Sequence, residues 1–167
     1  MRRWAALLLS VLFPVMSLVA CRGEPCPPWE MLSEVLATVG EATPAGEVFY
    51  SSPSCGGEGR VLDETLLLSL YGREDGYCEY EGRVECAAVF LSSGDGAPYL
   101  EIAVFLCYGS ADTRPILEMC LRRARLVSSL GFVEREEAVV VTSGRLVLFC
   151  LASDGEVRER VEEKYGK

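Results

Sequence analysis

Cysteine and acidic side chains are the groups in this chain that could carry chemistry, because none of its 167 residues is a histidine. Without an imidazole, Ser-His-Asp and Cys-His nucleophiles cannot form, and the commonest zinc and copper ligand is missing. The chain also lacks a nucleophile elbow, a Walker loop and a dinucleotide-binding glycine motif. The sequence therefore predicts no catalytic constellation, no cofactor and no metal site.

Carboxylates are concentrated in the segment 74–82, which reads Glu-Asp-Gly-Tyr-Cys-Glu-Tyr-Glu-Gly. A pair of acids can serve a hydrolase as general acid and base, and Asp75 and Glu79 are the candidates for those roles. Carboxylates and carbonyls can also hold Ca²⁺, but the spacing matches no calcium-binding loop. An exposed acidic turn is the simpler interpretation. A hydrolase that uses Asp75 and Glu79 is the alternative.

Eight cysteines are present, and seven of them follow Cys21. Cys26, Cys55 and Cys78 lie in predicted loops and are disulfide candidates outside the cytoplasm, where we favour the pair Cys55–Cys78. No C-x-x-C spacing exists, so neither a thiolate metal site nor a thioredoxin-like pair is expected. The remaining cysteines lie in apolar strands or on a helix and are expected to be buried thiols: Cys86, Cys107, Cys120 and Cys150.

The first twenty residues have the layout of a secretory leader. Arg2 and Arg3 precede an uncharged run from 4 to 20, which is shorter than the about 20 apolar residues of a membrane-spanning helix. The run ends in Leu-Val-Ala-Cys at 18–21, which resembles the bacterial lipobox. In such precursors a diacylglyceryl group is attached to the cysteine sulfur and the leader is cut off before it. The resemblance implies lipid on Cys21; an uncleaved anchor and an ordinary signal peptide are the alternatives.

The net charge excludes one class of partner. The whole chain carries −9, and removal of the leader leaves 14 basic and 25 acidic residues, a net charge of −11. Such an acidic chain is unsuited to nucleic acid, whose phosphates require a surface of Lys and Arg. We expect contact with the membrane through lipid on Cys21, on its extracytoplasmic face, and an envelope protein as a possible partner. The oligomeric state is left open.

The predicted organisation is a signal peptide (1–20), a lipidated Pro-rich tether (21–28) and a single domain (29–167), divided into an N-terminal helix and loop (29–60) and a core (61–167). Hydrophobic periodicity, N-caps and stop glycines predict the elements. Helices are expected at 29–40, 63–70, 112–131 (or from Ser110) and 154–165, strands at 84–91, 99–108, 137–141 and 146–151, and a loop at 41–59.

The longest predicted helix, 112–131, has one apolar side and one basic side. Leu117, Leu121, Ala124 and Val127 are expected to face the core, and the arginines to face the solvent: Arg122, Arg123 and Arg125. Each predicted hairpin is followed by a helix. We therefore predict an α+β fold, an antiparallel four-stranded sheet of ββαββα order with the N-terminal helices packed on it.

The segment 62–166 resembles a family of bacterial lipoproteins typical of Gram-positive anaerobes, known as a domain of unknown function. The resemblance lies in the helix end Leu-Tyr-Gly at 70–72, the strands at 88–94 and 100–105, and the Arg-rich helix. The strand pair 139–150 and a terminal helix that ends in Glu-Lys-Tyr-Gly complete the pattern. It implies the same fold and export and supplies no reaction. The leading functional hypothesis is a non-catalytic binding or accessory domain.

Overall fold

The computed structural model describes residues 26–52, 55, 59–94, 96–133 and 138–166. The predicted leader and Cys21 lie outside these ranges. The class is α+β, as predicted. The elements in chain order are α1 (Pro28–Val39), η2 (Gly40–Ala42), β1 (Gly46–Tyr50), β2 (Arg60–Val61), α2 (Glu64–Tyr71), β3 (Val84–Ser92), β4 (Leu100–Cys107), η4 (Ser110–Asp112), α3 (Thr113–Ser129), β5 (Val139–Ser143), β6 (Leu146–Ala152) and α4 (Gly155–Tyr165).

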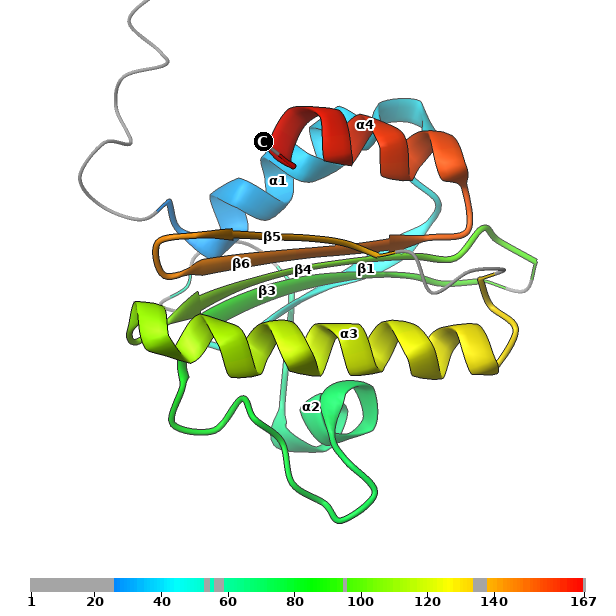
Figure 1. Ribbon diagram of the computed structural model, residues 1–167. Helices are drawn as coiled ribbons and strands as arrows, with labels where there is room; N and C mark the ends of the chain where they lie inside the picture. The colour runs from blue at the N-terminus through cyan, green and yellow to red at the C-terminus, as the bar shows by residue number, and fades with distance from the viewer. Residues whose placement is uncertain (1–25, 53–54, 56–58, 95, 134–137, 167) are drawn as a thin grey trace, which may run out of the picture.

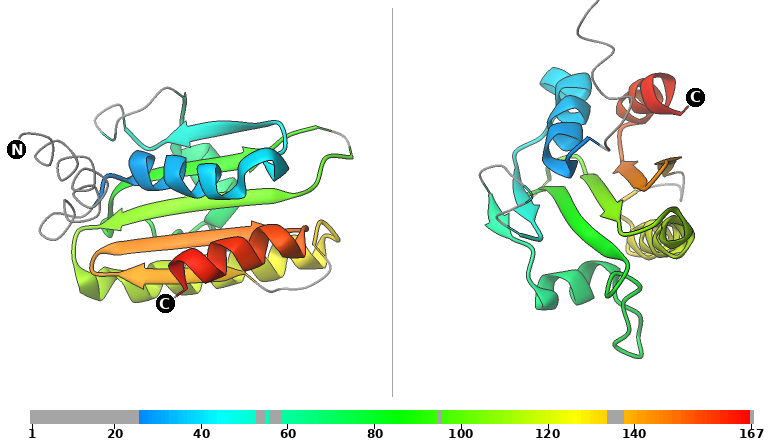
Figure 2. Two further views of the ribbon diagram at one scale, coloured as in Figure 1. Left: turned by 90° about the horizontal axis from the view of Figure 1, so that it is seen from above. Right: turned by 90° about the vertical axis from the view of Figure 1, so that its left-hand side faces the viewer.

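The strands form one mixed sheet of six in the order β2-β1-β3-β4-β6-β5. Only β1 and β2 are paired in parallel, and the other neighbours are antiparallel. Helices α1 and α4 cover one face of the sheet, and α2 and α3 cover the other (Figures 1 and 2). We call these the α1 face and the α3 face. The domain therefore has three layers, with a core on each side of the sheet.

The predicted four-stranded antiparallel sheet of ββαββα order is wrong, because β1 and β2 extend the sheet and precede the predicted strands. Strand β1 comes from the segment 41–59, which was expected to be a loop. It pairs with β3 from Gly46↔Ser92 to Tyr50↔Ala88, and Phe49 becomes buried. The apolar edge of β3 selects this conformation, since strand formation depends on tertiary pairing more than on local sequence.

The α1 face has an apolar core. Helix α1 has Pro28 in its first turn and buries Leu32, Val35 and Val39, which lie on one side of the helix. Helix α4 begins at the N-cap Asp154, whose carboxylate accepts a hydrogen bond from the Glu156 amide at 2.8 Å. None of the helices in the described ranges is long and apolar enough to cross a membrane.

The α3 face is covered by α2, capped by Asp63, and by the longer α3. Helix α3 buries Ile116, Met119, Cys120, Ala124 and Val127. The predicted orientation of this helix is wrong at two positions, because Leu121 is exposed and the Arg123 side chain is only 11% exposed. Arg123 lies on the same side of α3 as Ile116, Cys120 and Val127. This side faces the sheet, where Arg123 forms an ion pair with the carboxylate of Glu101.

The β3–β4 turn and the start of helix α1 lie at opposite ends of the sheet (Figure 1). The pairing of Gly46 with Ser92 brings the connection from α1 to β1 next to the β3–β4 turn. Helix α1 starts at the other end of the sheet from that turn (Figure 1), and its first residue is Pro28. The end of α3 lies beside the turn as well. The point where the chain enters the domain is therefore far from the β3–β4 turn.

Candidate functional site

Glu101 is the one charged residue among the fully buried residues of the described chain. It lies in β4 between Leu100 and Ile102, which pack on the α1 face, and its side chain points to the α3 face. Since side chains alternate along a strand, the register that buries these neighbours forces the carboxylate into the opposite core. A charge at such a position requires partners.

Three side chains supply those partners. The Tyr71 hydroxyl donates to Oε1 of Glu101 at 2.9 Å, and the Tyr99 hydroxyl donates to Oε2. Arg123 donates from Nε to Oε2 at 2.9 Å and from Nη2 to the Tyr99 oxygen at 3.1 Å. We call Tyr71, Tyr99, Glu101 and Arg123 the Glu101 network. It joins α2, β4 and α3 in one buried ion pair with two phenols.

The environment fixes the protonation of the two phenols and of the guanidinium in this network. Burial raises the pKa of Tyr71 and of Tyr99 well above the usual value of 10.0, and the charge of Glu101 raises it further. Burial lowers the pKa of Arg123, but the attraction of Glu101 outweighs it, so the net pKa is raised above its usual value. Both phenols therefore remain hydrogen-bond donors and the guanidinium remains charged.

A groove of about 600 Å³ lies directly beside this network. One wall is the β3–β4 turn, with Ser92 and Pro98, and the other is the end of α3, with Val127 and Leu130. Tyr99 and Arg123 of the network line it too, together with Phe132 and Ser153. We call this the hairpin groove. Its volume is within the range of small-molecule sites, roughly 300–1,000 Å³.

The walls of the hairpin groove are held in place by short-range contacts. Gly131 adopts φ +80°, which lets the chain turn back after α3 so that the Phe132 amide donates to the Val127 carbonyl. The Phe132 ring lies 5.7 Å from the Tyr99 ring, centroid to centroid. The Ser153 hydroxyl accepts from the Tyr99 amide at 3.0 Å. The groove is therefore formed before a ligand arrives.

Large apolar side chains are exposed at the rim of this groove. Leu130 is 61% exposed and Phe132 is 58% exposed. Single exposed apolar residues are common in soluble proteins, but these two are neighbours and flank a cavity with a charged floor. This combination suits a ligand with an apolar part and one or two hydrogen-bonding groups.

The acidic segment 74–82 has a structural role. Glu79 accepts two hydrogen bonds from Arg122 of α3, at 3.0 and 2.5 Å, and Arg122 also donates to the Tyr71 carbonyl. Burial raises the pKa of Glu79, but the hydrogen bonds and charge of Arg122 outweigh it, so the pKa lies below 4.5. Asp75 accepts from the amide of Tyr77 and lies 3.6 Å from Arg73. A hydrolase would need a raised pKa on one acid, which Glu79 does not have.

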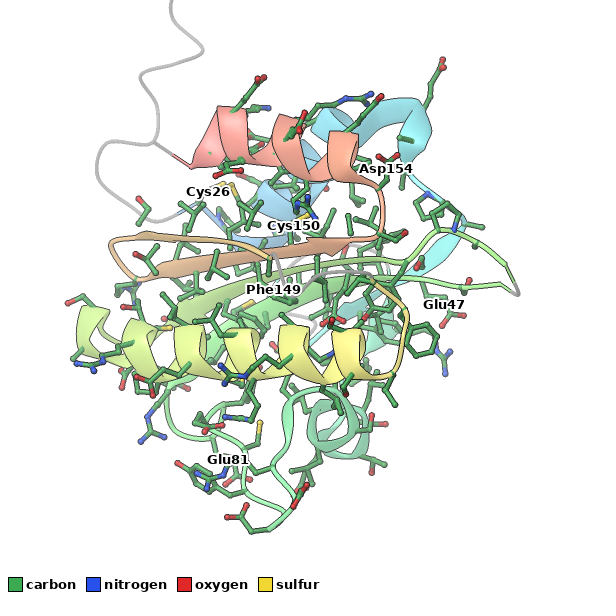
Figure 3. The ribbon with its side chains drawn as sticks, turned by 45° about the vertical axis from the view of Figure 1, so that its right-hand side comes forward. Cys26, Glu47, Glu81, Phe149, Cys150 and Asp154 are labelled. Atoms are coloured by element: carbon green, nitrogen blue, oxygen red, sulfur yellow. A yellow bond between two sulfur atoms is a disulfide. The ribbon has the colours of Figure 1, made fainter. Side chains whose placement is uncertain are left out.

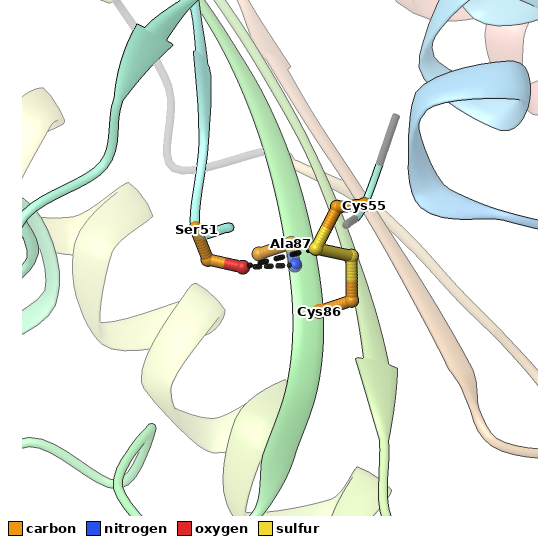
Figure 4. Close-up of a disulfide and its surroundings, with 4 residues drawn as sticks. All are labelled: Ser51, Cys55, Cys86 and Ala87. Atoms are coloured by element: carbon orange, nitrogen blue, oxygen red, sulfur yellow. Dashed lines mark hydrogen bonds between the residues drawn. A yellow bond between two sulfur atoms is a disulfide. The ribbon is translucent and has the colours of Figure 1, made fainter. Parts of the chain in front are cut away.

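The predicted disulfide Cys55–Cys78 is wrong, because Cys55 is bonded to Cys86 (Figure 4). Pairing of β1 with β3 brings the chain after β1 beside Cys86: the Ser51 hydroxyl accepts from the Ala87 amide at 2.8 Å and lies 3.5 Å from Cys55 Sγ. This proximity depends on a strand that the sequence pattern did not reveal. Cys78 is instead a buried thiol, 3.8 Å from the sulfur of Met119.

The other thiols follow the prediction in part. Cys107, Cys120 and Cys150 are buried and free, as expected, whereas Cys86 is buried but bonded. Cys26 is partly buried and lies 3.6 Å from a carboxylate oxygen of Glu30. Within the described ranges, no group of three or more cysteine and acidic residues is arranged to hold a metal ion.

Sequence reasoning missed the Glu101 network and the hairpin groove. The signal for the network was present: Glu101 interrupts the apolar run from Leu100 to Cys107, and a lone carboxylate in a buried strand needs a cation. The matching cation was Arg123, on the apolar stripe of the following helix. The groove had no comparable signal, since it arises where a turn and a helix end meet.

Comparisons of the chain with protein-family models, with curated proteins and with solved structures found no match. The resemblance to the lipoprotein family therefore stays a prediction.

Proposed function

We propose that this chain is a lipid-anchored extracytoplasmic protein whose domain binds an envelope partner in the hairpin groove and catalyses no reaction. The leader and Cys21 support the anchor, because a basic start, an uncharged run and a cysteine after small residues are typical of lipoprotein precursors. The net charge of −11 after the leader supports a partner other than nucleic acid.

The observation that carries the binding proposal is the position of Phe132 and Leu130 over the Glu101 network. Two exposed apolar side chains line a groove whose floor, Tyr99 and Arg123, is locked by hydrogen bonds to Glu101. A preformed site avoids part of the entropy cost of ordering its side chains on binding. An arrangement of this kind favours recognition, since it offers apolar area beside a fixed polar surface formed by Tyr99 and Arg123.

The location of the groove is consistent with an anchored binding domain. It lies beside the β3–β4 turn, at the end of the sheet away from Pro28, where the predicted tether joins α1 (Figure 1). With lipid on Cys21, the predicted tether joins the domain at Pro28, at the end of the sheet opposite the groove. A partner can then reach Phe132 without contact with the lipid surface.

The anchor is tested with the variant Cys21→Ser in the full chain. We expect the wild-type chain to lose the leader, gain the mass of a diacylglyceryl group on Cys21 and partition with membranes. The variant should carry no lipid and leave the membrane fraction. A variant that still sediments with membranes would support an uncleaved anchor, and an unmodified, secreted wild type would support an ordinary signal peptide.

The groove is tested by photo-crosslinking in the producing cell. Benzoylphenylalanine replaces Phe132 in the groove and, as a matched control, Glu118, whose side chain is 61% exposed on α3 but does not line the groove. We expect one discrete adduct from position 132, absent at position 118 and reduced by Leu130→Asp. Equal adducts at both positions, or none at position 132, would contradict the proposed site.

A further inference from the structure

The two edges of the sheet are protected to different degrees. The β2 edge is two residues long, and its Arg60 is paired with Glu47 of β1 at 2.8 Å. The β5 edge is five residues long and reads Val-Val-Val-Thr-Ser, with no charge and no proline. Open edges bind other strands, so natural proteins usually shorten them or place charges and prolines there. Strand β5 has none of these devices.

The register of β5 shows which backbone groups point outward. Its partner is β6, with Ser143 opposite Leu146 across the two-residue turn Gly144–Arg145. Gly144 has φ +59°, the conformation required at the first turn residue of a type II′ hairpin. The closing pair and every second pair are hydrogen-bonded in such a ladder. The N–H and C=O groups of Val140 and Thr142 therefore point away from β6, and neither residue bonds through its backbone to another described segment.

A second groove, of about 540 Å³, lies along this edge between β5 and α4. Glu159 and Glu162 line it, and both are exposed. The cations of α4 on the far side are directed to α1: Arg160 donates to the Val39 carbonyl and Lys164 to the Thr38 hydroxyl. Arg158 also lines the groove but already interacts within the chain. The β5 groove thus combines an open strand edge with two carboxylates.

We propose that β5 accepts an extended segment of a basic protein as a seventh strand. Side chains of the added strand alternate between the two faces of the sheet. Those on the α1 face are lysine or arginine and meet Glu159 and Glu162, and those on the α3 face are apolar and continue the surface of Val140. This interaction is separate from the hairpin groove and does not depend on it.

A second copy of this chain is the less suitable occupant. Antiparallel pairing of two β5 strands is generated by a two-fold axis perpendicular to the sheet, which leaves both α4 helices on the same side. Glu159 and Glu162 of each copy would then approach the same residues of the other, and each whole chain carries −9. Like charges across an interface disfavour it.

The test uses the full chain in a neutral detergent and a fluorescent peptide of alternating valine and lysine. Two matched peptides serve as controls: one has glutamate in place of lysine, and one is N-methylated at alternate amides, which removes donors from one edge. Fluorescence anisotropy should give binding at least about tenfold tighter for the basic peptide than for either control. The double variant Glu159→Lys/Glu162→Lys should weaken this binding by about tenfold. Glu163→Lys, at an exposed position of α4 that does not line the groove, should change it less than about twofold.

Hydrogen exchange locates the added strand. The amides of Val140 and Thr142 should exchange more slowly when the basic peptide is bound, whereas those of Val139 and Val141 are already bonded to β6 and should change little. Equal binding of the N-methylated or the acidic peptide would overturn the proposal, as would protection elsewhere or no binding at about 1 mM peptide. A concentration-dependent dimer that protects Val140 would overturn it in favour of a second copy.

Discussion

The two faces of the sheet are built from the same strands but solve their packing differently. Phe149 and Cys150 are neighbours in β6 and point to opposite faces (Figure 3). On the α1 face, the core is apolar side chains and one disulfide. On the α3 face, the core encloses Glu101 and its ion pair with Arg123.

The difference shows what a buried charge does in this fold. An apolar core contributes stability but permits neighbouring arrangements of similar volume. The Glu101 network restricts α3 to one position relative to the sheet, because its hydrogen bonds require Arg123 and Tyr99 at fixed places. Since Arg123 and Tyr99 also line the hairpin groove, the buried charge fixes the position of part of its lining.

The largest effect should come from breaking the ion pair on the α3 face. The variant Arg123→Met leaves Glu101 buried without its cation, and we expect a loss of about 3–5 kcal/mol in the free energy of unfolding. The double variant Glu101→Leu/Arg123→Met should recover most of it. Urea unfolding followed by tryptophan fluorescence measures both. A loss below about 1 kcal/mol in the single variant would show that the two faces are energetically alike.

The second-largest loss of stability should come from removing the disulfide of the α1 face. Cys86→Ala breaks a link across 31 residues of sequence. We expect the free energy of unfolding to fall by about 2–4 kcal/mol, mainly because the unfolded chain gains entropy. Cys55→Ala should have a similar effect, and the double variant should lose little more than either. A reductant should destabilise the wild type and leave Cys86→Ala unchanged. Insensitivity of the wild type would contradict the link.

A smaller loss in the free energy of unfolding is expected when one methylene is removed from a side chain of β4, the strand that contains Glu101. Ile102 is fully buried on the α1 face, and Ile102→Val should cost about 0.5–1.5 kcal/mol. Because no charge is involved, the loss should be the same at pH 7 and pH 4 and at low and high salt. Unfolding curves under the four conditions test this. A loss that depends on pH would mean that the two faces are electrostatically coupled.

The smallest effect concerns the contact of Glu79 with Arg122 at the outer side of α3. The folded-state pKa of Glu79 is lowered, so the stability it contributes is fully present above the unfolded value, near 4.5, and is lost as the pH falls through the folded value. Glu79→Gln should therefore be less stable than the wild type at pH 7 and equal to it in strong acid. Glu156→Gln, whose side chain is 80% exposed, is the control and should have little effect at either pH. A difference for Glu79→Gln that persists in acid would contradict the assignment.

Most elements could be predicted from local patterns. The hairpin strands at 84–91 and 146–151 and the four helices depend on periodicity, caps and turn residues that lie within each segment. β1 could not be found in this way, because Val48 to Tyr50 form a strand only against the edge of β3. The pairing of Cys55 with Cys86 depends on the same strand and was missed for the same reason.

The functional candidates show the same division between local and tertiary information. Cys21 is defined by its neighbours in sequence, whereas the hairpin groove exists only when the β3–β4 turn meets the end of α3. Arg123 was expected in solvent, because charge usually outweighs position on a helix. Its place in the core becomes predictable once Glu101 is known to be buried on the facing strand.

Under the proposed lipid anchor, the distance from Pro28 to the β3–β4 turn determines how far from the membrane the hairpin groove can lie. Strand β3 has nine residues, about 30 Å at 3.3 Å per residue, and the seven residues from Cys21 to Pro27 add about 20 Å if extended. With lipid on Cys21, the hairpin groove then samples a layer up to about 50 Å from the bilayer. Partners would then be selected by their distance from the bilayer as well as by their chemistry. A longer tether between Cys21 and Pro28 would change which partners the groove can reach.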